Sequence, residues 1–193
     1  MTHLRSTLLS TLMIVASLLS VPAFAHTEAT SANFIAGVLH PLSGIDHLLA
    51  MIAVGMWAAQ QKGKTRFNAP ASFLAMLFIG FILGMNAITL PYIETGIALS
   101  VLLLGLMLAL TIRLPKQLAL ALIGSFALYH GIAHGAEFIG ASAALFAFGF
   151  MFSTLVLHIL GLYSSQKLQS TMPIVIKTLG SFVAITGATL LVS

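Results

Sequence analysis

The stretch of the chain that decides the fold runs from residue 32 to residue 59 and reads ANFIAGVLHPLSGIDHLLAMIAVGMWAA. Crossing a bilayer takes about 20 predominantly apolar residues in a helix, so this segment is long enough to span one. Proline removes a helix hydrogen bond and glycine loosens the backbone. We therefore expect the helix to break near Pro41 and Gly44, with freed carbonyl groups facing a pocket inside the protein.

The rest of the chain repeats this apolar character. Of its 193 residues 59% are hydrophobic and 6% are charged, whereas a soluble domain carries about 25% charged residues. Five more apolar segments follow the first, at residues 72–90, 96–112, 118–136, 139–162 and 173–192. They are too long for barrel strands and lack the alternation of such strands. The predicted fold class is all-α: a polytopic membrane helical bundle of six transmembrane helices after a cleaved signal peptide.

Residues 1–25 have the pattern of that signal peptide. Arg5 gives a basic start, an apolar middle covers residues 8–19, and residues 23–25 read Ala-Phe-Ala, which fits the small-x-small cleavage rule. The alternative is an uncleaved first transmembrane helix. The predicted organisation is thus a signal peptide over residues 1–25 and a six-helix transmembrane domain over residues 26–193, with His26 as the new N-terminus.

Basic residues alternate between the predicted loops. The first, third and fifth loops carry or adjoin all the basic residues after the signal peptide: Lys62, Lys64, Arg66, Arg113, Lys116, Lys167 and Lys177. By the positive-inside rule these loops face the cytoplasm, which predicts a multi-pass protein of the bacterial inner membrane with both mature termini in the periplasm. Basic residues placed this way are orientation signals and not a nucleic-acid-binding patch.

Glycines at four-residue spacing predict close helix packing. Gly80 and Gly84 form such a pair in the second segment, and Gly131 and Gly135 form another in the fourth. Small residues at this spacing let helices approach closely in lipid. This supports a compact bundle and leaves the oligomeric state open.

Two clusters of ionisable residues fall inside predicted spans. The first span holds His40, Asp46 and His47, and the fourth holds His130, His134 and Glu137. An aspartate at the centre of a span costs about 2.5–3.5 kcal/mol on insertion scales, so such residues need a reason to be there. Residues three, four or seven positions apart lie on the same face of a continuous helix. His40 and His47 would therefore share one face, and so would His130, His134 and Glu137. If the two spans are neighbours, the clusters form a single pocket open to the periplasm.

Imidazole and carboxylate are ligands that suit nickel, zinc, cobalt or iron. The chain has no cysteine, which excludes thiolate sites. Three further residues leave their roles open. His158 is expected to make a helix–helix hydrogen bond, with a place on the ion's exit path as the alternative. Asn86 is expected to be structural, and His26 has an amine and a ring that could bind metal.

The two clusters resemble the signatures of the HupE/UreJ family of nickel and cobalt transporters. The first signature reads His40-Pro41-Leu42-Ser43-Gly44-Ile45-Asp46-His47, followed by Ala50-Met51, and the second reads His130-Gly131-Ile132-Ala133-His134-Gly135-Ala136-Glu137. The resemblance implies nickel supply to hydrogenase or urease maturation in a bacterium. It also implies that the six residues His40, Asp46, His47, His130, His134 and Glu137 handle the metal.

The predicted function is therefore transport, and the protein is not expected to be an enzyme. It would carry Ni²⁺ or Co²⁺ across the lipid bilayer to a cytoplasmic nickel chaperone. No prosthetic group is expected, because the metal is the transported ion. No Gly-x-x-x-x-Gly-Lys-[Ser/Thr] motif is present, so the metal gradient, the membrane potential, protons or a partner would drive the ion. The alternatives are an intramembrane metalloenzyme, a metal sensor or assembly subunit, and a proton-coupled carrier of another solute.

Overall fold

The computed structural model describes residues 33–138, 140 and 142–192. Within these ranges the chain forms helices and no strands, which confirms the predicted all-α class. The helices are α2 (Phe34–Ser43), α3 (Ile45–Gln60), α4 (Thr65–Met85), α5 (Ile93–Ala109), α6 (Lys116–Glu137), α7 (Ala143–Thr171) and α8 (Pro173–Val192). The predicted signal peptide and His26 lie outside the described residues.

Most of the helices are long and apolar enough to cross a membrane. α4, α6, α7 and α8 each satisfy the requirement alone, and α2 and α3 satisfy it together. α5 is apolar but has only 17 residues, or about 25 Å of helix, against a hydrocarbon core of about 30 Å. By length and composition the described residues thus hold four spans, or five if α2 and α3 count as one.

One predicted loop is wrong. The fifth loop was expected at residues 163–172, but α7 continues as a helix to Thr171. The apolar run thus ends before the helix does. Leu168, Lys167 and Gln169 are good helix formers, so the polar continuation remains helical. α4 likewise begins at Thr65, inside the predicted first loop.

The predicted break in the first span is confirmed. α2 and α3 meet at Gly44 with an angle of 89° between their axes. Gly44 has an extended backbone and is both the C-cap of α2 and the N-cap of α3, while Pro41 lies inside α2. His40 and His47 therefore belong to different helices. The prediction that they share one helix face is wrong, because that geometry requires a continuous helix.

Glycines bring the helices together in pairs. A Cβ atom added at Gly131 would fall on the carbonyl oxygen of Leu77, and one added at Gly84 would fall on that of Ile132. The two predicted glycine pairs thus face each other across the α4–α6 interface within one chain. The same close approach joins α3 to α7 through Gly55 and Gly161.

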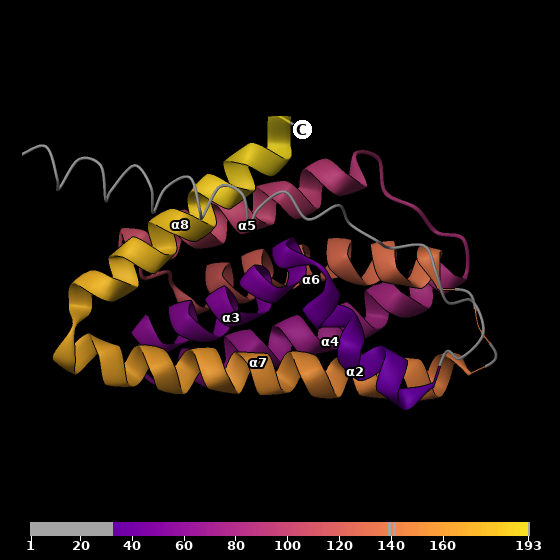
Figure 1. Ribbon diagram of the computed structural model, residues 1–193, viewed down its shortest axis with the longest axis horizontal. Helices are drawn as coiled ribbons and strands as arrows, with labels where there is room; N and C mark the ends of the chain where they lie inside the picture. The colour runs from indigo at the N-terminus through magenta and orange to yellow at the C-terminus, as the bar shows by residue number, and fades with distance from the viewer. Residues whose placement is uncertain (1–32, 139, 141, 193) are drawn as a thin grey trace, which may run out of the picture.

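These pairs form a layered bundle (Figure 1). α7 runs along one side of the molecule, with α2 and α3 packed against it, and α5 and α8 lie together on the other side. α4 and α6 form the remaining pair. The core between them contains Trp57, Phe73 and Phe150, all almost completely buried. The indole of Trp57 donates to the carbonyl oxygen of Ile112 at 2.8 Å, so its polar atom is satisfied.

Replacing Gly131 by valine should destabilise the bundle. The added methyl groups would overlap the α4 backbone at Leu77, and overpacking of this kind costs about 1–3 kcal/mol. Thermal unfolding in detergent should show a lower midpoint for Gly131→Val. Ala121→Val is the matched control, because Ala121 lies on the exposed side of the same helix. Equal midpoints for the two variants would contradict the proposed packing.

Candidate metal-binding site

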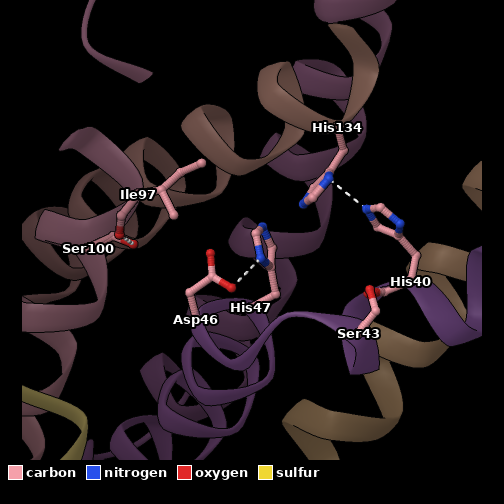
Figure 2. Close-up of polar contacts among 7 residues, drawn as sticks. All are labelled: His40, Ser43, Asp46, His47, Ile97, Ser100 and His134. Carbon is pink, nitrogen blue, oxygen red and sulfur yellow. Dashed lines mark hydrogen bonds and ion pairs between the residues drawn. The ribbon is translucent and has the colours of Figure 1, made fainter. Parts of the chain in front are cut away.

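Three helices bring the two predicted clusters together. The ring centre of His134, on α6, lies 4.4 Å from that of His40, on α2, and 4.3 Å from that of His47, on α3. The ring centre of His130, one turn earlier on α6, lies 5.1 Å from that of His47. Figure 2 shows His40, His47 and His134 converging from their separate ribbons. The histidines of the first and fourth predicted spans thus lie together, while a single pocket open to the periplasm stays a prediction.

The three helices that carry the histidine cluster, α2, α3 and α6, make their main backbone contacts with α4 and α7 and not across the cluster. α6 packs most extensively against α4, while α2 and α3 pack against α7. The imidazole rings themselves fill the space between α6 and the α2–α3 break. The 89° bend makes this possible, because it aims His40 and His47 at His134 from two directions.

His47 is held by its neighbour Asp46. The Nδ1 atom of His47 lies 2.9 Å from Oδ1 of Asp46 (Figure 2), and the two side chains are 13% and 24% exposed. Asp46 is in the first turn of α3, where the helix dipole favours a negative charge. The carboxylate accepts a hydrogen bond from Nδ1–H, so the lone pair of the neutral His47 ring is on Nε2. That Nε2 is buried and has no hydrogen-bond partner.

His130 has the same arrangement with a different acceptor. Its Nδ1 donates to the carbonyl oxygen of Phe126 at 2.9 Å. A carbonyl can only accept, so the Nε2 of a neutral His130 carries the lone pair. The side chain is completely buried, and Nε2 has no partner.

His40 and His134 share one hydrogen bond. Nε2 of His40 and Nδ1 of His134 are 2.7 Å apart (Figure 2). When His134 Nδ1 is the donor, its Nε2 carries a lone pair, and this atom too is buried without a partner. Phe146 and Phe150 of α7 form an apolar wall, with Phe150 centred 5.0 Å from His134 and 5.7 Å from His40. Sequence reasoning missed this wall, because phenylalanines in an apolar span carry no signal that sets them apart.

The site thus presents three unpartnered Nε2 atoms, from His47, His130 and His134, beside one carboxylate. Buried polar atoms without partners are rare and unfavourable, and a metal cation would satisfy a ring nitrogen that carries a lone pair. Among the described residues, however, no three His, Asp or Glu side chains are arranged to enclose one ion. The hydrogen bond between His40 and His134 occupies two further nitrogens, Nε2 of His40 and Nδ1 of His134. Enclosing an ion would therefore require these rings to reorient.

The other predicted residues are Glu137, Asn86 and His158. Glu137 is the last residue of α6, three positions beyond His134, and is exposed. Asn86 donates to the carbonyl oxygen of Ile82 at 2.8 Å and caps α4, which agrees with its predicted structural role. His158 makes the expected helix–helix hydrogen bond, from Nδ1 to the carbonyl oxygen of Met51 at 2.7 Å.

Replacing Asp46 by asparagine should weaken binding of Ni²⁺ or Co²⁺ to the purified protein. The variant keeps the size of the side chain but removes the charge that orients His47, and losing such an orienting partner lowers metal affinity by about 10–100-fold. Equilibrium dialysis in detergent measures the change. Unaltered affinity would show that the Asp46–His47 pair takes no part in binding.

Comparisons with known proteins identify the family of this chain. A family model described as "HupE / UreJ protein" matches residues 13–190. The chain is 39% identical over 178 residues to Protein HupE of Rhizobium leguminosarum bv. viciae, covering 90% of this chain and 93% of that protein. No solved structure matches. Both clusters lie inside the matched region, and the chain belongs to the HupE/UreJ family.

Proposed function

We propose that this multi-pass membrane protein is a permease for a divalent transition-metal ion. Ni²⁺ is the first choice and Co²⁺ the second, and the ion would supply hydrogenase or urease maturation. The observation that carries the proposal is the set of three buried, unpartnered Nε2 atoms beside the Asp46 carboxylate. Nitrogen and oxygen donors without thiolate suit nickel and cobalt. The likeness of both signatures to those of nickel and cobalt transporters supports the choice of ion.

The electrostatics of the site favour a cation. α6 ends at Glu137, so the carboxylate adds to the partial negative charge at the C-terminus of that helix. A hydrated ion would be attracted to this end, exchange water for the imidazoles of His134 and His47, and have its charge offset by Asp46. A membrane potential that is negative inside favours entry by about 2.3 kcal/mol per charge per 100 mV.

In the part of the chain that the structure describes, no set of ligands encloses an ion, and such an open arrangement suits an ion that is transported. An ion that passes through must be bound strongly enough to enter and weakly enough to leave. Opening the His40–His134 hydrogen bond would give the ion one more nitrogen on entry, and re-forming that bond would favour its release. The rings of His40 and His134 would thus assist both the entry and the release of the ion.

Cells that produce this protein should accumulate radioactive nickel, and Asp46→Ala and His134→Ala should reduce uptake to the background of cells without it. Each change removes one of the groups that replace water around the ion. Ser125→Ala is the control, since Ser125 is exposed on α6 and bonds only to the helix backbone at Ala121. Uptake must be compared at equal protein levels in the membrane.

The alternatives predict different outcomes. A sensor or assembly subunit would bind the ion without accumulating it. A metalloenzyme would release a product, and a proton-coupled carrier of another solute would transport that solute when metal binding is lost. Equal nickel uptake in the wild type and both site variants would overturn the site assignment.

We further propose six spans in the inner membrane with both mature termini in the periplasm, α5 being the short span. Because the chain has no cysteine, single cysteines can report its orientation. Tyr92→Cys, at a site that is 83% exposed before α5, should react with an impermeant maleimide in right-side-out vesicles. Lys62→Cys, in the exposed α3–α4 connection, should react only in inverted vesicles. The opposite pattern would refute this orientation.

A further inference from the structure

His158 lies in α7, away from both signatures, and is as buried as the clustered histidines. Its side chain is 1% exposed. Nδ1 donates to the carbonyl oxygen of Met51 on α3 at 2.7 Å. Gly55, one turn further along α3, lets the two backbones approach closely here, since an added Cβ would meet the His158 carbonyl.

The hydrogen bond to Met51 uses only one side of the His158 ring. A carbonyl oxygen only accepts, so the proton is on Nδ1 and the Nε2 of the neutral ring is a free acceptor. Nε2 is buried and has no partner. A histidine that served only to join two helices would not need a second nitrogen, because an amide would make the same bond. His158 thus has the arrangement of His47 and His130: an anchored Nδ1 and an unpartnered Nε2.

His158 also lies close to the clustered histidines. The ring centre of Phe73 is 6.1 Å from that of His130 and 5.0 Å from that of His158. The two histidine rings are therefore separated by no more than the sum of these distances. A single phenylalanine lies beside both.

A second unpartnered group lies between His158 and the cluster. The hydroxyl oxygen of Thr154 is buried without a partner, and the side chain is fully covered. Thr154 is one turn before His158 and one turn after Phe150, which contacts the rings of His40 and His134. From Phe150 to His158 is roughly 12 Å along the helix. Residues 150, 154 and 158 thus form one line on α7, leading away from the cluster.

We propose that Nε2 of His158, with the hydroxyl of Thr154, forms a second, inner station for the divalent cation. The ion would leave the outer cluster beside His130, pass Phe73 and be received by His158 before release on the far side. This inference rests on the proposed transport function, and it assigns the inner half of the path to α7. Two weak stations in series give an ion a way forward without a deep energy minimum.

The decisive variant is His158→Asn. The amide nitrogen of asparagine is one bond from Cγ, as Nδ1 is in histidine, so it can keep the hydrogen bond to the Met51 carbonyl. The change removes Nε2 together with Cε1 and places the amide oxygen near the position of Cδ2. The protein is purified, reconstituted into liposomes that contain a nickel-sensitive dye, and tested for Ni²⁺ entry. Thermal stability and equilibrium Ni²⁺ binding in detergent are measured on the same preparations.

We expect His158→Asn to slow Ni²⁺ entry by about tenfold, which corresponds to a barrier raised by about 1.4 kcal/mol. Binding at the outer cluster and thermal stability should stay at the wild-type level. Thr154→Val, which removes the hydroxyl at constant size, should slow entry by a smaller factor. Thr186→Val is its control, because Thr186 is also a buried threonine but lies on α8 and donates to Phe182.

Entry at the wild-type rate in His158→Asn would overturn the inner station and leave the proposed function intact. A variant that loses equilibrium binding together with entry would also overturn it, since His158 would then belong to the outer site. If His158→Leu alone loses both stability and entry while His158→Asn loses neither, the role is structural. A wild-type protein that moves no Ni²⁺ overturns the proposed function, and this inference with it.

Discussion

Each imidazole buried in this bundle has two ring nitrogens that need hydrogen-bond partners away from water. The site depends on which of the two nitrogens finds a partner in the protein. Asp46 accepts a hydrogen bond from Nδ1 of His47, the Phe126 carbonyl accepts one from Nδ1 of His130, and the Met51 carbonyl accepts one from Nδ1 of His158. All three acceptors fix the same tautomer. The Nε2 atoms are therefore left as lone-pair donors without partners, and this is the chemical state in which histidine binds a metal.

Holding these rings in place requires a rigid frame, which the glycine interfaces supply. α6 lies against α4 with glycine facing backbone on both sides, so His130 and His134 extend from a helix that has little freedom to shift. α3 is held against α7 in the same way near His158. The α3–α7 interface also contains His158, whose Nδ1 bonds to the Met51 carbonyl. Dispersion and close backbone contact keep the helices in place, while the histidines remain available to an ion.

The break at Gly44 separates two tasks that one straight helix could not perform together. α3 buries its apolar residues against α7 and carries Asp46 at the end where its dipole favours a carboxylate. α2 turns away by 89° and brings His40 to the opposite side of His134. An extended glycine permits this turn.

The sequence alone determined the all-α class, the break in the first span, the glycine pairs and the histidines that lie together. Each of these follows from local chemistry: the length of apolar runs, the missing N–H of proline, or the expense of an ionisable group in a span. The end of α7 could not be predicted from the sequence. A polar stretch such as residues 163–171 can form helix or loop, depending on its surroundings in the folded protein.

Only the tertiary structure decided how the site is built. The spacing of His40 and His47 placed them on one face of a single helix, whereas a bend of unpredictable angle and direction brings them together at His134. The anchors of His130 and His158 are backbone carbonyls, which no side-chain pattern can reveal. His158 was separated from both signatures in sequence. Its likeness to the histidines of the signatures is visible only in the folded protein, where Nδ1 has a hydrogen-bond partner and Nε2 has none.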